Sequence, residues 1–423
     1  MKLTIKDLLQ RQIVIRLSLL QLLSLLLTIY IIWELYWWHT IGLRFIKWHT
    51  HFIFTGLLIS LILAPPMAFI WILKKTYLRK TLSVSLSIWT TLILTELILM
   101  ATGWNQTYME KRSGFYQSPY ECNTKNYYLT HPSKEKLFRT SLEFNWSVLS
   151  NSLGFVYKEW PLVKDSSKIR VITLGDSFTE GDGAPTDSCY PTLMQNILGE
   201  NYEILSAGVR GSDPVFGEKN LEDRLLPYKP DIVVQSISEN DILFDLCIRG
   251  GYERFQPDNK IKFNTPPWWE TIYAMSYVSR IFWNALGYNI EQPCDNTYNS
   301  TTIIKEVLDH FERVAATNNI TVLIVLFPTK YEVYRNTYDY DYSEIKSYIQ
   351  KLPHVVYTDL FPCYREYIKQ SGKKKEDFYW VIDDHHNSTG YHMMAECIAK
   401  AVQNTISSSP LDKVYEKTDT TLF

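Results

Sequence analysis

Serine, histidine and aspartate occur in two short segments whose composition would allow nucleophilic chemistry. The first segment, Gly175–Gly181, directly follows an apolar run and holds Ser177 on a glycine-flanked turn. The second, Asp383–Tyr391, holds two aspartates, two histidines and an asparagine just before the last helical pattern. A serine hydroxyl becomes a useful nucleophile when a nearby base takes its proton, and histidine, with a pKa of about 6.5, suits that task. The two segments therefore favour a serine nucleophile activated by a histidine.

Two further segments could stabilise the negative charge that develops on an attacked carbonyl oxygen. Ser206–Ser212 is a glycine-bearing loop that can present a backbone N–H, and Ser238–Asp241 offers the side-chain amide of Asn240. The amides that open the helix after Ser177 could act in the same way. Taken singly, each match has an ordinary explanation, such as a helix cap at Ser177 or a turn at Asn240. Their combination is the informative feature.

Short β-branched runs alternate with longer helical patterns after about residue 168, which predicts an α/β fold with a parallel sheet covered on both faces. Catalytic groups in such sheets gather at the carboxyl ends of the strands. The candidate strands are Ile169–Leu174, Tyr202–Ser206, Asp231–Ile237, Ile320–Phe327 and His354–Thr358. The candidate helices are Tyr190–Leu198, Val215–Leu226, Thr301–Thr317, Tyr342–Lys351, Cys363–Gln370 and Ser388–Val402.

The four segments, in this order, resemble the four blocks of the SGNH hydrolases, a branch of the GDSL esterases and lipases. The resemblance covers about Asn151–Val402 and includes the preamble Asn151–Phe155, which is often seen upstream of the nucleophile in related bacterial proteins. It implies a flavodoxin-like three-layer α/β/α fold. It also implies hydrolysis of carboxylic esters without a cofactor.

The resemblance carries roles over to individual residues. It makes Ser177 the nucleophile, His385 the general base and Asp383 the residue that orients the base. The oxyanion hole would consist of the backbone N–H groups of Ser177 and Gly211 and the side chain of Asn240. These assignments predict a Ser-His-Asp triad.

Some features leave alternatives open. The family's Asp-x-x-His spacing is met by Asp383 and His386, although the pattern His-x-Asn-x-x-Gly favours His385. The same histidines and aspartates are also of the types that bind metal ions. Ser206 and Ser238 replace an asparagine and a glycine that the second and third blocks usually contain. Neither replaced position supplies a catalytic group.

Three apolar stretches in the first hundred residues are long enough to cross a bilayer, which takes about 20 helical residues. They run approximately over Leu17–Trp38, Phe52–Leu73 and Leu82–Gly103. Basic residues cluster before the first stretch and between the second and third, so the positive-inside rule places the N-terminus in the cytosol. Everything after Gly103 would then be extracytoplasmic. Glu96, in the third stretch, is expected to be a snorkelling or protonated carboxyl, because no partner is obvious.

These patterns divide the chain into a membrane anchor (1–103), a connector without clear periodicity (104–167), a hydrolase domain (168–406) and a flexible tail (407–423). The net charge of -2 indicates no attraction to nucleic acid. All six cysteines follow the anchor, and no CxxC pair occurs, which argues against a zinc ribbon. Disulfides would fit an exported domain, but their pairing cannot be deduced.

The resulting expectation is a membrane-anchored serine esterase that acts outside the cytosol on O-acyl or O-acetyl esters of small molecules, glycans or lipids. An O-acyltransferase using the same serine is an alternative. Since three spans are too few for an acyl-donating module, a transferase would require a separate membrane partner. A non-catalytic binding protein on a hydrolase fold is a third reading, although the sequence retains every catalytic residue type.

Overall fold

The computed structural model describes residues 91, 94–96, 98–99, 102, 122–123, 128–255, 277–287 and 300–407. The chain divides into two compact units. The first unit is Met1–Gln117 with Thr265–Gln292, and the second is Ser118–Asn264 with Pro293–Phe423. The sequence pattern did not predict that a segment within the hydrolase domain, residues 265–292, groups with the N-terminal part.

A five-stranded parallel sheet forms the centre of the second unit. In space the strands follow the order β6-β5-β7-β8-β9, with every neighbouring pair parallel. In chain order this is 2-1-3-4-5, the flavodoxin-like order of doubly wound sheets. The predicted parallel α/β sheet is therefore confirmed. The strands are β5 (Ile169–Leu174), β6 (Tyr202–Ser206), β7 (Ile232–Ile237), β8 (Thr321–Leu326) and β9 (Val355–Asp359).

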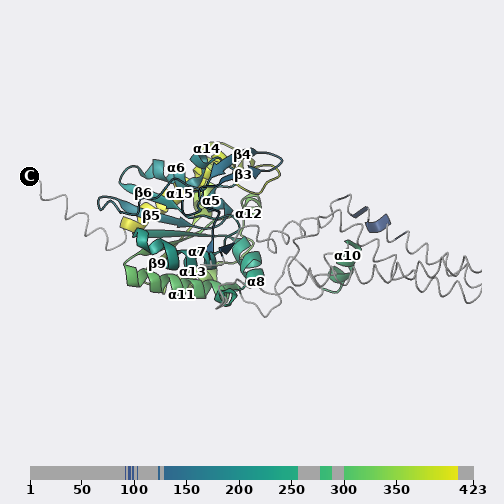
Figure 1. Ribbon diagram of the computed structural model, residues 1–423. Helices are drawn as coiled ribbons and strands as arrows, with labels where there is room; N and C mark the ends of the chain where they lie inside the picture. The colour runs from purple at the N-terminus through teal and green to yellow at the C-terminus, as the bar shows by residue number, and fades with distance from the viewer. Residues whose placement is uncertain are drawn as a thin grey trace, which may run out of the picture. The chain divides into compact units, whose positions relative to one another are not determined.

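Helices cover both faces of the sheet (Figure 1). Apolar side chains from the strands and the helices form a core on each face. One face packs against α7 (Pro214–Asn220), α11 (Ser300–Asn318) and α13 (Ser343–Ile349). The other packs against α6 (Tyr190–Leu198), α14 (Leu360–Ser371) and α15 (Ser388–Ser407). All six residues of β7 are buried, as expected for a central strand covered on both faces.

Short helices connect these layers and account for most differences from the predicted boundaries. The predicted helix Val215–Leu226 continues past α7 as a π-helical turn and a 3₁₀ turn. Helix α14 begins earlier than predicted because the carboxylate of Asp359 accepts the N–H of Phe361 and caps it. The short elements are α5 (Ser177–Glu180), η1 (Thr186–Ser188), η2 (Leu221–Leu225), η3 (Leu226–Tyr228), η4 (Asp241–Asp245), α8 (Leu246–Arg249), η5 (Tyr252–Arg254), α12 (Lys330–Arg335) and η6 (Lys375–Phe378).

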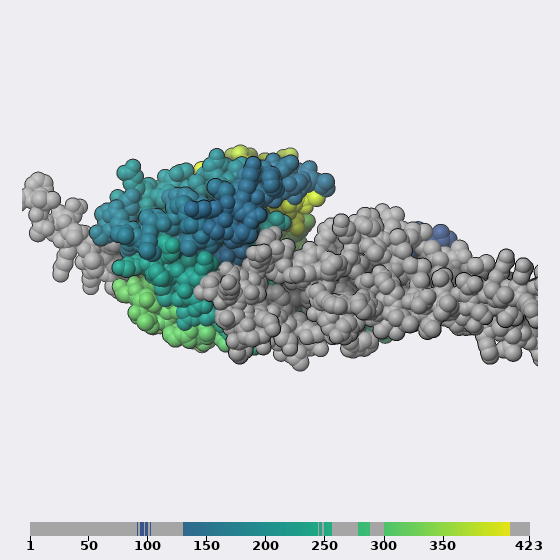
Figure 2. All heavy atoms as spheres, viewed as in Figure 1, coloured from purple at the N-terminus to yellow at the C-terminus, as the bar shows by residue number. Residues whose placement is uncertain are grey.

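An antiparallel hairpin lies in the segment that the sequence indicated only as a connector. Strands β3 (Lys136–Thr140) and β4 (Asn145–Leu149) pair over five residues each, and β1 (Cys122–Asn123) pairs with β2 (Tyr128–Leu129). Most β3 and β4 side chains remain at least partly exposed, so their sequences lack a strong apolar alternation. The N-terminal part of the second unit, in blue, lies at the molecular surface in Figure 2.

A buried guanidinium anchors this hairpin to the segment that follows Ser177. Arg139 of β3, only 3% exposed, forms ion pairs with the carboxylates of Glu180 and Asp182. His131 reaches the same Glu180 carboxylate at 2.9 Å. Since a buried charge is tolerated only when it is paired, the hairpin is held firmly against the main sheet's carboxyl edge.

Two of the three predicted membrane spans, and most of the third, lie outside the described residues, as does nearly all of the predicted tail. Among the described residues, no helix combines the length and apolar character needed to cross a membrane. The spans and their orientation stay predictions. Within the first unit, the buried carboxylate of Glu96 accepts the N–H of Val278, in the first turn of α10 (Tyr277–Ala285), at 2.9 Å. Glu96 thus has a partner that the sequence did not predict.

Disulfides are present in the second unit. Cys363 of α14 and Cys397 of α15 are bonded, with their Cα atoms 5.9 Å apart, and join two helices on the same face of the sheet. Cys247 is disulfide-bonded as well. Cys189 is free and buried. Disulfides are typical of exported domains.

Candidate active site

Ser177 lies on a tight turn between β5 and α5, at the carboxyl edge of the sheet. Gly175 makes this turn possible, because a Cβ there would lie 2.1 Å from Ser236 Oγ and 2.2 Å from Thr179 Oγ1. Asp176 caps α5 by accepting the N–H of Phe178 at 2.9 Å. Burial raises the pKa of the Asp176 carboxyl to about 6. Ser177 itself, the first residue of α5, remains partly exposed.

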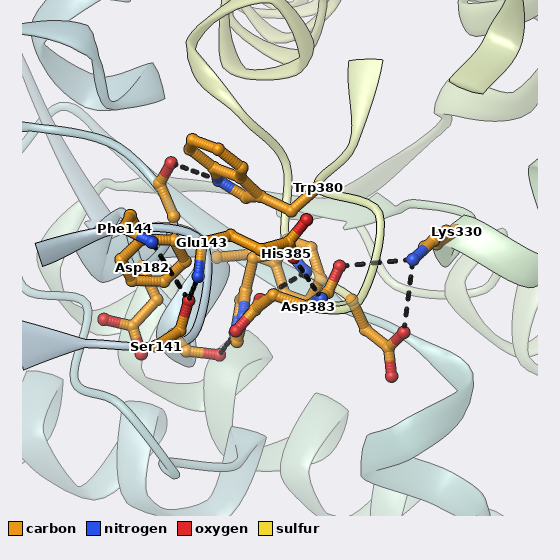
Figure 3. A network of polar contacts seen from close by, with 12 residues as sticks. Ser141, Glu143, Phe144, Asp182, Lys330, Trp380, Asp383 and His385 are labelled. Carbon is orange, nitrogen blue, oxygen red and sulfur yellow. Dashed lines mark hydrogen bonds and ion pairs between the residues drawn. The ribbon is translucent and has the colours of Figure 1, made fainter. Parts of the chain in front are cut away.

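His385 and Asp383 form a continuous hydrogen-bonded chain with Ser177. His385 Nε2 lies 2.7 Å from Ser177 Oγ, and His385 Nδ1 lies 2.6 Å from Asp383 Oδ1. The same Asp383 oxygen accepts the backbone N–H of His385 at 2.9 Å. Figure 3 shows the His385 and Asp383 side chains within this polar network. This arrangement is the geometry that a serine nucleophile, a base and an orienting carboxylate require.

Electrostatics favour the charge distribution that such a triad uses. Burial acts to lower the pKa of His385, but its hydrogen bond to Asp383 and the charges of Asp182, Asp383 and Asp176 raise it above the ordinary 6.5. Burial acts to raise the pKa of Asp383, but the hydrogen bond and charge of His385 lower it below 3.8. Asp383 is therefore ionised at neutral pH, and the imidazolium form of His385 is stabilised.

This coupling predicts the pH dependence of turnover. Only neutral His385 can accept a proton, so kcat/KM should fall on the acid side with a midpoint above 6.5. Asp383→Asn removes the hydrogen-bonded carboxylate, which is one of the groups that raise the pKa of His385, so the midpoint should move to lower pH. The asparagine should also lower kcat by about 10⁴-fold, because it no longer orients and charges the base correctly. A pH–rate profile of both proteins measures the two effects, and an unchanged midpoint would contradict them.

His386 occupies a different environment, although it adjoins His385 in the chain. Its ring is fully buried, and its Nε2 lies 3.1 Å from the hydroxyl of Tyr364. Burial lowers the pKa of His386 to about 3, so the ring is neutral at physiological pH. The structure therefore brings His385, and not His386, to Ser177.

The second-block loop lies against the serine turn because β6 and β5 are neighbours. Val209 donates its N–H to the carbonyl of Gly175 at 3.0 Å. Gly208 packs so closely that a Cβ there would lie 2.4 Å from the Glu180 amide nitrogen. Gly211 lies farther along the loop on an exposed turn, with a φ of +72°.

The third-block segment lies beyond β7, the other neighbour of β5. The carboxylate of Asp241 accepts the N–H of Ser238 at 2.8 Å and closes the turn that carries Asn240. The partly exposed side chain of Asn240 immediately precedes η4. All four predicted segments thus lie at the carboxyl edge of the sheet, whereas the oxyanion-hole roles of Ser177, Gly211 and Asn240 stay predictions.

Asn240→Ala tests the side-chain donor of the predicted oxyanion hole. Loss of one preorganised donor typically costs about 10²–10³ in rate. Because the donor would contact the developing oxyanion, we expect kcat to fall by that factor while KM changes little. Steady-state kinetics with an aryl ester measure this. An effect confined to KM would assign Asn240 to substrate binding instead.

The histidines and aspartates of the fourth block do not gather as a metal site. His386 is directed to Tyr364, and exposed Asp384 lies 3.7 Å from the ammonium of Lys330. In the part of the chain that the structure describes, one other group, Glu239, Glu332 and Asp339, has ligand atoms close enough for an ion. Two of these carboxylates already accept hydrogen bonds from Thr329, which caps α12.

No family model matches the sequence, and no curated protein matches it either. Similar solved structures include an esterase active on acetylated mannans, an acetyl xylan esterase and a psychrotrophic esterase from Pseudoalteromonas sp.. The mannan-active esterase is 13% identical (TM-score 0.35), and the match covers 57% of this chain but only 50% of that one. The xylan esterase is 22% identical (TM-score 0.34), and the match covers 55% of this chain and 100% of that one. The Pseudoalteromonas enzyme is 10% identical (TM-score 0.34), and the match covers 57% of this chain and 100% of that one. Because these TM-scores are low, the assignment of function rests on the geometry of the site.

Three charged residues near the site were missed as site residues from the sequence. Arg139 and Glu143 belong to the β3–β4 hairpin, in the segment without clear periodicity, and Lys330 begins the short helix α12 after β8. The available signal was weak, namely charged residues on a short exposed strand pair. Their partners are backbone groups or carboxylates far away in the chain, and no sequence pattern indicates such contacts.

Proposed function

We propose that this protein is a serine esterase that hydrolyses carboxylic esters through an acyl-enzyme on Ser177. The observation that carries the proposal is the unbroken chain of hydrogen bonds from Ser177 Oγ through His385 to Asp383. The partly exposed imidazole of His385 is charge-coupled to Asp383 and lies within hydrogen-bond reach of a partly exposed serine hydroxyl, which is the arrangement that a serine nucleophile requires.

The proposed reaction has two stages. His385 Nε2 takes the proton of Ser177 as its oxygen attacks the ester carbonyl, and the tetrahedral oxyanion collapses with protonation of the departing alcohol by the imidazolium. Water then attacks the acyl-enzyme and gives a proton to His385, and the imidazolium returns that proton to Ser177 Oγ as the bond to the acyl group breaks and the acid is released. Asp383 holds the imidazole in one tautomer throughout and stabilises its protonated form.

The predicted membrane spans bear on where the esterase would act. Three membrane-spanning helices with a cytosolic N-terminus would hold the second unit at the outer face of a membrane. The substrates we propose are therefore O-acyl or O-acetyl esters on glycans or lipids close to that surface. A fusion of a reporter after Gly103 that proved cytosolic would contradict this topology.

Full-length protein in detergent tests the proposed activity. It should hydrolyse short-chain aryl esters, and a serine-directed phosphonate should inactivate it by forming one adduct. Absence of both reactions in folded protein would contradict the proposal. Product analysis with an acyl donor and a sugar acceptor separates hydrolysis from transfer, since a transferase would give the acylated sugar.

A further inference from the structure

The loop that carries Asp383 and His385 is held in position by contacts with other segments of the chain. It connects η6 to α15 and is closed at its base by a bridge between Tyr379 and His386. Its tip is not fixed by burial, because Val381 is 86% and Ile382 63% exposed. Since Asp383 directly follows this exposed tip, its position must come from specific contacts.

The β3–β4 hairpin supplies one set of contacts through the carboxylate of Glu143. This single group accepts three consecutive backbone N–H bonds, from Val381 at 2.7 Å, Ile382 at 2.8 Å and Asp383 at 2.7 Å. Desolvation acts to raise the pKa of Glu143, but the three amides lower it below 4.5. The ionised carboxylate thus binds the amide groups of the loop tip. Hydrogen bonds to an ionised acceptor are stronger than those between neutral groups.

Lys330, the first residue of α12, holds the carbonyl side of the same tip. Its ammonium donates to the carbonyl oxygens of Val381 at 2.9 Å and Asp383 at 3.2 Å, and the side chain is only 3% exposed. An anion therefore binds the amides and a cation binds the carbonyls of one short segment (Figure 3). Each charge matches the polarity of the backbone groups that it contacts.

The hairpin that carries Glu143 is itself fixed relative to the nucleophile. Arg139 pairs with Glu180, the last residue of α5, which begins with Ser177. Next to Glu143, the ring of Phe144 lies 5.3 Å from that of Trp380, whose indole N–H donates to Gly183 at 2.7 Å. Both ends of the triad are thus tied to one hairpin.

We propose that Glu143 is a positioning residue that sets the distance and direction between Asp383 and His385, with Lys330 as its counterpart. It touches no reacting atom. It acts through the amide of Asp383, whose carboxylate in turn orients the base. Misplacement of a catalytic group by about 1 Å can cost on the order of 10²-fold in rate, so a contact of this kind is worth detecting. The expected changes in kcat and in the pH midpoint of turnover rest on the proposed function, whereas the contacts of Glu143 do not.

The test compares full-length wild type with Glu143→Ala, Glu143→Gln and Lys330→Met. Glu159→Gln is the matched control, because Glu159 also accepts a backbone N–H, from Ser152 at 3.0 Å, but has an exposed side chain on another loop. Two readouts are followed. One is kcat and KM for a short-chain aryl ester across pH. The other is the downfield proton resonance of the His385–Asp383 hydrogen bond, which requires no turnover.

Glu143→Ala should lower kcat by about 10- to 100-fold and leave KM within about twofold. The midpoint of the acid limb, and the titration of the downfield proton, should move down toward 6.5. Glu143→Gln, which keeps one acceptor oxygen, should show a smaller change in the same direction, and Lys330→Met should lower the same midpoint. Glu159→Gln should match the wild type.

The inference is overturned if Glu143→Ala keeps the acid-limb midpoint and the downfield-proton titration of the wild type. This holds also if the activity of Glu143→Ala falls, but only in proportion to the fraction of folded protein. If the wild type fails to hydrolyse any ester, the proposed function fails by itself. The proton resonance still decides in that case whether Glu143 positions Asp383 against His385.

Discussion

Ser177→Ala is expected to lower kcat for ester hydrolysis by on the order of 10⁶-fold and to abolish labelling by a serine-directed phosphonate. The physical reason is that the alanine removes the atom that forms the acyl bond, whereas His385 and Asp383 remain paired. Steady-state kinetics and intact-mass measurement on full-length protein check the two effects. The remaining rate would come from binding and oxyanion stabilisation alone.

Ser166→Ala is the matched control for this substitution. Ser166 is exposed and lies before the first residue of β5, whereas Ser177 lies after its last residue. Its removal should leave the kinetics and the labelling unchanged. If Ser177→Ala retained wild-type turnover while the protein remained folded, another nucleophile would have to be found.

His385→Ala should reduce kcat by a similar factor, on the order of 10⁶-fold, because the serine hydroxyl then has no base within reach. Phosphonate labelling should slow correspondingly, since it depends on the same activated oxygen. The neighbouring histidine offers a stringent comparison. His386→Gln should lower the thermal unfolding midpoint, because it disturbs a fully buried ring bonded to Tyr364, but it should leave the pH midpoint of turnover unchanged.

Opposite results for the two histidines would reverse the assignment. A pH midpoint that responds to His386→Gln and survives His385→Ala would make His386 the base and would require the loop to rearrange. The structure argues against this, because the neutral ring of His386 is fully buried, packs edge-on against Phe178 and has its Nε2 3.1 Å from the hydroxyl of Tyr364.

The sheet and the positions of the four segments could be predicted from the sequence for a simple reason. Each central strand is a short, mainly apolar run that is buried on both faces, and such runs are visible without knowledge of their partners. A polar segment at the end of such a strand must lie at the carboxyl edge of a parallel sheet. His385, 208 positions from Ser177, lies before α15 and follows no strand, so its approach to Ser177 was predicted from the resemblance of the four segments to the SGNH blocks.

The supports of the site could not be predicted in this way. Glu143 binds backbone amides as many as 240 positions away. Every residue except proline has such an amide, so the sequence does not indicate which ones a carboxylate will bind. Arg139 lies on a strand with mostly exposed side chains, so its burial between Glu180 and Asp182 depends on the tertiary fold alone. The partner of Glu96, Val278, is another backbone N–H, 182 positions away.

The most direct measurement is to quench full-length protein with acid during turnover of an aryl ester and to map the acyl group by peptide mass spectrometry. The account predicts one acylated peptide, with the acyl group on Ser177, that is absent from Ser177→Ala. An acyl group on any other residue, or turnover with no covalent intermediate under conditions in which deacylation is slow, would contradict it.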